Sequence, residues 1–344
     1  MQKLLSVAIP CYNSQDYVSK AIESLLPGGE KVEILVVDDG SKDNTSAIAE
    51  EYIEKYPDIV RLIKKENGGH GDAVMAGLTN ATGLYFRVLD SDDWLGEEAL
   101  KKLLEVLEEM RDPEKTADLV ITNYVYEKVH EHRHHTVDYR KNLPVGQLFG
   151  WDQVGRFSMG SYILMHAATY RTEVARNSKM VLPKHTFYVD HLFVCYPMMY
   201  VEKMYYLDVD LYHYYIGRED QSVNEKVMLS RLDQQLRVNR QMIYDMGLEE
   251  VKDQKKKDYL YYYTEVVTAA TVTFLIRTKT KENEEVMHSF LNEIEEKNPD
   301  FYQWITRRPI SRHPVGPIQK LPHFIVYPSV NLIYSIVRNV VQFN

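Results

Sequence analysis

Short apolar segments alternate with segments of helical periodicity between residues 4 and 129, and this order constrains the fold more than any other feature of the chain. The apolar segments are 4–10, 32–40, 59–65, 84–90 and 117–129. The helical segments between them are 16–26, 44–56, 67–83 and 96–110. This alternation is typical of βαβ units. We therefore expect an α/β fold with a mostly parallel sheet flanked by helices.

Composition narrows the class of protein. The net charge of −9 argues against nucleic acid as a partner, because a phosphate backbone requires a clustered basic face. Two cysteines are too few for a disulfide framework and fit a reducing compartment. The sequence has neither the features of a signal peptide nor an uninterrupted apolar stretch of about 18 residues. We therefore expect a cytoplasmic protein.

Polar side chains follow four of the expected strands, at the point where each strand ends. They occupy residues 10–13, 38–41, 67–71 and 90–93. Ligands of open parallel sheets bind beyond the carboxyl ends of the strands. In the last cluster Asp90, Asp92 and Asp93 repel one another and resist removal from water. The pattern predicts a binding site that includes a cation.

Four segments in this order resemble the motifs of family 2 glycosyltransferases, which have the GT-A fold: VAIPCYN, ILVVDDGSKDNT, NGG and VLDSDDW. The resemblance covers roughly residues 4 to 220. It implies a Rossmann-like catalytic domain at 1–222, and we expect a helical extension at 223–300 and a tail at 301–344. The implied activity is metal-dependent, inverting transfer of a hexosyl or N-acetylhexosaminyl group. The donor would be a UDP-sugar, and the acceptor a glycan or polyprenyl-linked molecule of surface polysaccharide biosynthesis.

The resemblance also gives roles to particular residues. Asp39 is expected to accept the uracil N3–H, a charge-assisted bond that cytosine cannot supply. Mg²⁺ or Mn²⁺ at the D-x-D motif would neutralise the diphosphate leaving group. We favour Asp92 as metal ligand and place Asp90 toward the ribose, while Asp93 is either a second ligand or a helix cap. The expected donor-binding residues are Pro10, Tyr12, Asn13, Asp39, Asn67, Gly69, Asp90, Ser91 and Arg218, and the expected metal ligands are Asp92 and Asp93.

The glycine-rich segment 67–71 has two features of interest. Its glycines, at 68, 69 and 71, are expected to let the backbone approach the donor closely. His70 either touches the diphosphate or is an exposed loop histidine.

The family places its general base in an acidic pair that opens a helix. By resemblance Asp190 is the base, within hydrogen-bond reach of the acceptor hydroxyl. Val189 stands where the first acid of the pair is usual, and the alternative for Asp190 is a helix cap. Arg218 either closes over the diphosphate, which suits a guanidinium fork, or lies on the surface.

The tail at 301–344 contains five basic residues and no acidic ones. Its apolar side chains recur at helical spacing, which predicts an interfacial helix beside a basic patch. The protein would then sit peripherally on the inner face of the cell membrane. The alternative is a helix packed on the C-terminal bundle.

Two other functions use similar residues. A nucleotidyltransferase also places carboxylates and a metal at strand ends, but usually has a glycine-rich basic loop after the first strand, where this chain has PCYNSQDY. The second alternative is a nucleotide-sugar-binding module without a catalytic base.

Overall fold

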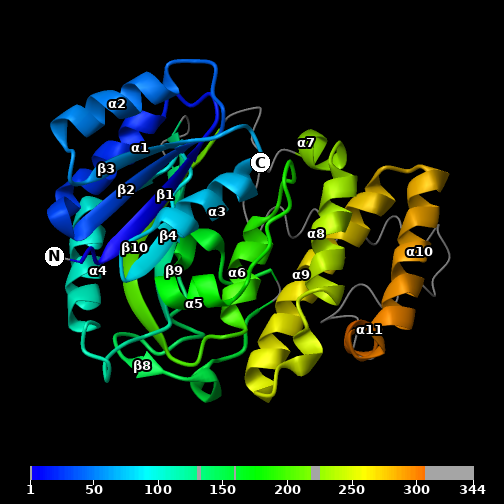
Figure 1. Cartoon of the computed structure of the whole chain (residues 1–344). Coiled ribbons are helices and arrows are strands. Elements are labelled where there is room, and N and C mark those ends of the chain that lie inside the picture. The colour runs from blue at the N-terminus through cyan, green and yellow to red at the C-terminus, as the bar shows by residue number, and fades with distance from the viewer. Residues whose placement is uncertain (1, 130–132, 159, 218–224, 307–344) are drawn as a thin grey trace. The chain divides into compact units, whose positions relative to one another are not determined.

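The structure is a computed structural model that describes residues 2–129, 133–158, 160–217 and 225–306 (Figure 1). The chain divides into two compact units. The first comprises Met1–Arg156 and Ile163–Gly217, and the second comprises Phe157–Tyr162 and the residues from Arg218 onward. The short segment Phe157–Tyr162 therefore belongs with the C-terminal residues, which its position in the sequence does not indicate.

The first unit contains a sheet in the order β3-β2-β1-β4-β9-β6-β10-β5, with β7 beside β6 and β8 beside β10. β1, β2, β3 and β4 are parallel, as are β6 and β10, whereas β9 runs antiparallel between β4 and β6. The strands are β1 (Leu5–Cys11), β2 (Val32–Asp38), β3 (Val60–Lys64), β4 (Tyr85–Val88), β5 (Trp94–Leu95), β6 (Leu119–Lys128), β7 (Arg133–Val137), β8 (Leu148–Phe149), β9 (Ala168–Arg171) and β10 (Met204–Ile216). The predicted α/β class and all five predicted strands are confirmed.

Every residue of β1 and β2 is buried. Both faces of the sheet are therefore covered at these strands. α1 contacts α2 and α4, and α5 contacts α3 and α6. The helices of this unit are α1 (Val18–Leu25), α2 (Thr45–Lys55), α3 (His70–Asn80), α4 (Glu97–Glu109), α5 (Thr172–Asn177) and α6 (Asp190–Met198), with 3₁₀ turns η1 (Leu26–Lys31), η3 (Trp151–Gln153) and η4 (Met165–Ala167).

The second unit is helical. It contains α7 (Glu225–Leu229), α8 (Leu232–Tyr244), the 3₁₀ turn η5 (Leu248–Glu250), α9 (Gln254–Arg277), α10 (Lys281–Lys297) and α11 (Pro299–Thr306). The long helix α9 contacts α8, α10 and α11. The Tyr262 hydroxyl donates to the carbonyl of Ser161 at 3.0 Å, and the Phe157 and Tyr259 rings lie 5.1 Å apart. These contacts explain why Phe157–Tyr162 joins this unit.

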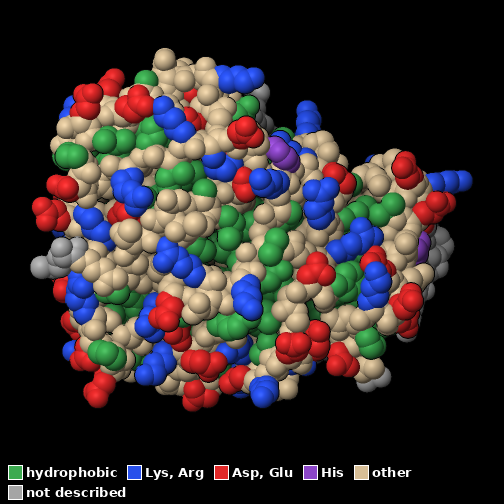
Figure 2. Space-filling model, in the orientation of Figure 1, with side chains coloured by type: hydrophobic (Ala, Val, Ile, Leu, Met, Phe, Trp, Pro, Cys, Tyr) green, Lys and Arg blue, Asp and Glu red, His purple; other side chains and the backbone are tan. Residues whose placement is uncertain are grey.

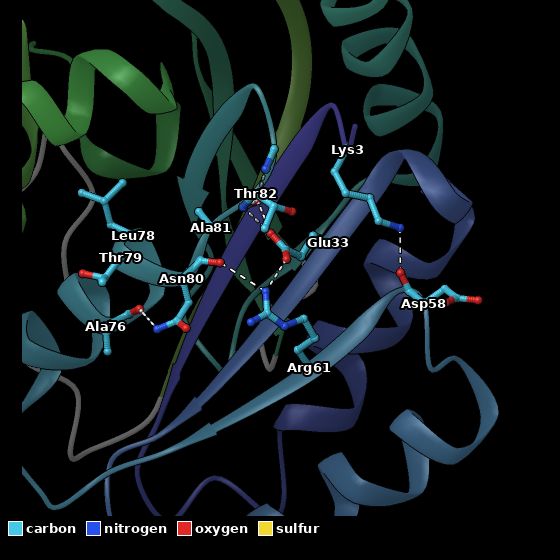
Figure 3. Close-up of polar contacts among 12 residues, drawn as sticks. Lys3, Glu33, Asp58, Arg61, Ala76, Leu78, Thr79, Asn80, Ala81 and Thr82 are labelled. Carbon is cyan, nitrogen blue, oxygen red and sulfur yellow. Dashed lines mark hydrogen bonds and ion pairs between the residues drawn. The ribbon is translucent and has the colours of Figure 1, made fainter. Parts of the chain in front are cut away.

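A buried carboxylate connects the strands near the amino ends of β1 and β2 (Figure 3). Glu33 accepts hydrogen bonds from the Ser6 hydroxyl at 2.5 Å, the Arg61 guanidinium at 2.6 Å and the Thr82 N–H at 2.8 Å. Arg61 also donates to the carbonyl of Asn80 at 3.2 Å. Burial alone would raise the pKa of Glu33, but these hydrogen bonds hold it below its ordinary value.

Acidic and basic side chains are interspersed on the face shown in Figure 2. Lys101, for example, lies 2.8 Å from Glu97 and 2.9 Å from Glu98. Within the part of the chain that the structure describes, no helix is both long enough and apolar enough to cross a bilayer.

We expect Glu33→Gln to lower the free energy of unfolding by about 2 kcal/mol at neutral pH, because it weakens three hydrogen bonds to a charged group. Since the folded-state pKa of Glu33 is depressed, its contribution is present above the unfolded-state pKa and is lost as the pH falls through the folded-state pKa. Urea unfolding of both proteins across acidic pH measures this, and their stabilities should converge at low pH.

The matched control is Glu50→Gln, which removes an exposed ion pair with Lys64 and should cost less than about 1 kcal/mol. Equal losses in the two variants would contradict the assignment of Glu33 as the stabilising carboxylate.

Candidate active site

Three of the predicted polar clusters meet at the carboxyl edge of β1, β2 and β4. The backbone N–H of Asn13 donates to the Ser41 hydroxyl at 3.0 Å, and its side-chain oxygen accepts from the Lys42 N–H at 2.9 Å. The hydroxyls of Ser14 and Ser91 lie 2.8 Å apart. The loop after β1 is therefore bonded to the loops after both of its neighbouring strands.

Asp39 is buried directly after β2, and its carboxylate organises the loop after β3. It accepts from the Lys65 ammonium at 2.5 Å and from the backbone N–H groups of Gly68 and Gly69 at 2.9 and 2.7 Å. The Asn67 side-chain amide donates to the Asp39 carbonyl at 2.9 Å. A carboxylate has about four acceptor positions, so one remains for a ligand N–H. The role of Asp39 as base reader stays a prediction.

The glycines of segment 67–71 allow close approach of the protein chain itself. Gly69 has a φ of +87°, and a Cβ there would lie 2.9 Å from the backbone nitrogen of His185. Cβ atoms at the neighbouring glycines would also meet side chains, Gly68 that of Asp72, and Gly71 those of Leu182 and Val189. Residues 182–189 therefore rest on this loop, and they lead directly into Asp190.

His70 is the first residue of α3, and its Nε2 lies 2.8 Å from Oδ1 of Asp90. Burial alone would lower the pKa of His70, but the carboxylate of Asp90 raises it above its ordinary value, with contributions from Asp190 and Asp92. Burial alone would likewise raise the pKa of Asp90, but the charge of His70 and its hydrogen bond hold it below its ordinary value. The two side chains are in direct contact, and the alternative of an exposed loop histidine is wrong.

Asp190 is the first residue of α6, and 29% of its side chain is exposed. The N-cap position belongs to Val189, and no side chain caps the helix, so the helix-cap alternative for Asp190 is wrong. Because its charge contributes to the pKa of His70, Asp190 lies in the same electrostatic environment as Asp90.

Asp93 is fully buried, and protein groups hold both of its carboxyl oxygens. The Tyr212 hydroxyl donates to Oδ2 at 2.5 Å, and the backbone N–H of Tyr215 donates to Oδ1 at 2.8 Å. Burial raises the pKa of Asp93 well above its ordinary value, and the charges of the other two carboxylates in the cluster add to this rise. The N-cap of α4 is Gly96, so the helix-cap alternative for Asp93 is also wrong.

Asp90, Asp93 and His166 bring ligand atoms within 4.8 Å of one another. Nε2 of His166 lies 3.9 Å from Oδ2 of Asp90. Burial lowers the pKa of His166, so its imidazole is neutral. Two carboxylates and a neutral imidazole suit a divalent cation, so the residues present fit the ion that the resemblance implies. Asp92, half-buried in the same turn, is not in this group, and its role as direct ligand stays a prediction.

The sequence did not identify His166 as a site residue. The available signal was a histidine within the otherwise apolar segment ILMHAATY, at residues 163–170. Its place in the site depends on η4 and β9, because β9 pairs antiparallel with β4 and carries this segment to the acidic cluster.

Of the remaining predicted donor-binding residues, two lie at the end of β1 and one lies outside the described residues. Pro10 is buried in β1 in register with Val37, whereas the side chain of Tyr12 is 51% exposed in the following turn. Arg218 lies outside the described residues, as do residues 307–344, which carry most of the predicted tail.

Comparison with known sequences shows which proteins the first half of the chain resembles. Residues 6–171 match the model of "Glycosyl transferase family 2". The minor teichoic acid biosynthesis protein GgaB of Bacillus subtilis is 36% identical over 110 residues, 31% of this chain and 12% of that protein. Glycosyltransferase GlyG of Streptococcus pneumoniae serotype 4 is 36% identical over 126 residues, 36% of this chain and 40% of that protein. These alignments span less than half of either relative. Residues 6–171, somewhat less than half of the chain, are therefore similar to glycosyl transferase family 2.

Solved structures confirm the expected GT-A type of fold. Staphylococcus aureus TarS aligns with a TM-score of 0.51 at 19% identity, over 87% of this chain and 54% of that chain. A mannosyltransferase from Pyrobaculum calidifontis, in complex with GDP-Man and Mn²⁺, aligns with a TM-score of 0.51 at 15% identity, over 96% of this chain and 88% of that chain.

We expect Gly69→Ala to destabilise the first unit by at least about 2 kcal/mol, because alanine is strained at this φ and its Cβ would contact His185. The His185 N–H, which bonds to the Gly68 carbonyl at 2.7 Å, should exchange with solvent faster. Hydrogen exchange by NMR or mass spectrometry measures this at the level of the segment.

Gly146→Ala is the matched control, because Gly146 also has a positive φ, 69°, but nothing lies within 4 Å of a Cβ there. Unchanged exchange of residues 182–189 in Gly69→Ala would show that the glycine loop does not hold this segment.

Proposed function

We propose that the protein is an inverting, metal-dependent glycosyltransferase. It moves a hexosyl or N-acetylhexosaminyl group from a UDP-sugar to a glycan or lipid-linked acceptor in surface polysaccharide biosynthesis. The catalytic domain is taken as residues 1–222, followed by a helical extension at 223–300.

One observation carries this proposal: the segment at 67–71 contacts both the acidic cluster, where His70 Nε2 lies 2.8 Å from Asp90, and residues 182–189, which lead into Asp190. Asp90 belongs to the acidic cluster that suits a cation and a diphosphate, while Asp190 stands at the start of a different element, α6. A displacement at the anomeric carbon needs a base and a stabilised leaving group on opposite sides of the sugar. The two carboxylates come from separate elements, the turn after β4 and the start of α6, which supports this division of roles.

In the proposed reaction, the Asp190 carboxylate accepts the proton of the acceptor hydroxyl. The hydroxyl oxygen forms the new bond to the anomeric carbon while the bond from that carbon to the diphosphate oxygen breaks, which inverts the configuration. The nucleoside diphosphate departs with the electron pair of the broken bond. When bound, the divalent cation supplies positive charge to the leaving diphosphate. The amino end of α3, which begins at His70 beside Asp90, adds positive potential there.

A uridine donor is favoured by the hydrogen bonds that Asp39 already makes. Three of its approximately four acceptor positions are filled by Lys65, Gly68 and Gly69. The remaining position suits a single N–H, as in uracil, better than the two adjacent donors of guanine. The exposed ring of Tyr12 provides a surface for the base to stack on.

Two observations support the proposed class of acceptor: the name of one relative and the sequence of the tail. The name of GgaB refers to minor teichoic acid biosynthesis, which supports a surface polymer as the product here. The basic, apolar sequence at 301–344 supports contact with the anionic inner face of a membrane, where lipid-linked acceptors would be found.

We expect Asp190→Asn to lower the rate of sugar transfer by about 10²- to 10⁴-fold, because the amide cannot accept the acceptor proton. Donor binding should change little, since Asp190 does not belong to the acidic cluster. Release of UDP and formation of glycosylated product measure the rate, and isothermal titration with donor measures binding. Asp152→Asn, at an exposed carboxylate of the same unit, is the matched control. Unchanged turnover in Asp190→Asn would reject Asp190 as the base.

We expect a UDP-sugar to raise the unfolding temperature only when Mn²⁺ or Mg²⁺ is present. At a donor concentration 100 times its dissociation constant the stabilisation is about 2.7 kcal/mol. A panel of UDP- and GDP-sugars with Mn²⁺, with Mg²⁺ and with EDTA measures this by thermal shift. Stabilisation by GDP-sugars alone would contradict the uridine assignment, and full stabilisation in EDTA would contradict metal dependence.

A further inference from the structure

The ring nitrogens of His166 make no hydrogen bond among the described residues. Its Nδ1 is buried and unpaired, and its Nε2 lies 3.9 Å from Oδ2 of Asp90, beyond hydrogen-bond distance. The residue as a whole is only 9% exposed. A buried polar side chain without a partner is costly, so an unpaired imidazole beside two carboxylates needs an explanation.

The surroundings of His166 hold the ring in one orientation. The Arg87 guanidinium donates to the His166 carbonyl at 2.7 Å, which fixes the backbone. The ring lies 4.7 Å from that of Tyr212 at an interplanar angle of 77°, and 4.8 Å from that of Tyr214. Tyr212 also donates to Asp93, so the same residue positions the imidazole and one of the carboxylates.

We propose that His166 is a direct nitrogen ligand of the divalent cation, together with Asp90 and Asp93. The inference deepens the proposed function, because the ion is the one that the transfer reaction uses. With metal–ligand bonds of about 2.1 Å, adjacent ligand atoms of an octahedral ion are about 3.0 Å apart and opposite ones about 4.2 Å apart. The ligand atoms here lie within 4.8 Å of one another, so a pair that becomes opposite has to close by at most about 0.6 Å and an adjacent pair by at most about 1.8 Å.

A nitrogen ligand gives the site a preference among cations. Mg²⁺ favours oxygen ligands and keeps much of its hydration shell, whereas transition metals accept imidazole more readily. A site of two carboxylates and one imidazole should therefore bind Mn²⁺ and Co²⁺ more tightly than Mg²⁺. A site made of the three aspartates of the cluster would lack this source of discrimination.

The test compares His166→Gln with the unchanged full-length protein. Glutamine keeps a polar side chain of similar reach but offers oxygen in place of nitrogen. Binding of Mn²⁺ alone is followed by the loss of the free-ion signal in electron paramagnetic resonance, and Mg²⁺ and Co²⁺ are measured by competition. The same titrations are repeated with UDP present. Transfer of sugar is measured separately, so a failure of this inference is distinguishable from a failure of the proposed function.

We expect His166→Gln to weaken Mn²⁺ binding by at least about tenfold, since even the loss of an outer-shell partner typically costs 10- to 100-fold. Mg²⁺ binding should change much less, so the ratio of the two affinities falls. A merely structural role for His166 would weaken both ions alike. The matched control is His135→Gln, which removes an exposed imidazole stacked on Tyr126 with ring centroids 6.5 Å apart.

Three results would overturn the inference: an unchanged ratio of Mn²⁺ to Mg²⁺ affinity in His166→Gln, equal changes in His166→Gln and His135→Gln, or no Mn²⁺ binding by the unchanged protein with or without UDP. Far-ultraviolet circular dichroism and the unfolding temperature without metal establish that the variant is folded. If His166→Gln does not fold, His166→Asn is titrated in its place, with the same expected fall in the affinity ratio.

Discussion

The repulsion among the carboxylates that follow β4 is the constraint on which the site depends. Two unit charges 4 Å apart repel by about 4 kcal/mol at an effective dielectric constant of about 20, so groups from elsewhere must compensate for their proximity. The compensating groups come from distant parts of the chain. His70 pairs with Asp90, while Tyr212 and Tyr215 of β10 donate to Asp93. The acidic turn therefore reaches its final arrangement only when α3 and β10 are both in place.

The glycine-rich segment 67–71 after β3 contacts both Asp39 and the segment that leads into Asp190. Asp39 accepts hydrogen bonds from the backbone N–H groups of Gly68 and Gly69, and residues 182–189 pack against the same segment. Residues 182–189 lead into Asp190, the first residue of α6. A carboxylate proposed to bind the donor thus fixes, through backbone contacts, the position of the carboxylate proposed to activate the acceptor. Only glycine permits this, because a Cβ at Gly69 would meet the His185 backbone.

Much of this arrangement could be predicted from the sequence, because it follows from local patterns. The alternation of strands and helices predicted the α/β class. The polar residues at the strand ends predicted the edge of the sheet at which the site lies, since neighbouring parallel strands end together. The role of His166 depends on an antiparallel strand, β9, inserted between β4 and β6, which no local pattern specifies. The contacts of Tyr212 with Asp93 and of Gly69 with His185 likewise join residues far apart in the sequence. The packing of residues 182–189 against the glycines could not be predicted for that reason, and the expected approach of the glycines to the donor stays a prediction.

Arg87 connects the buried core of β4 to the residues that lie against the acidic cluster. Its side chain is fully buried in β4, where an unpaired charge is costly. Burial lowers the pKa of Arg87 to about 10, so the guanidinium stays charged at neutral pH. It donates to the His166 carbonyl at 2.7 Å and lies 5.7 Å from the centre of the Tyr212 ring. Burial is the main cause that lowers the pKa of His166, and the charge of Arg87 adds to this decrease. Arg87 therefore acts on the acidic cluster through His166 and Tyr212, the residues that lie beside Asp90 and Asp93.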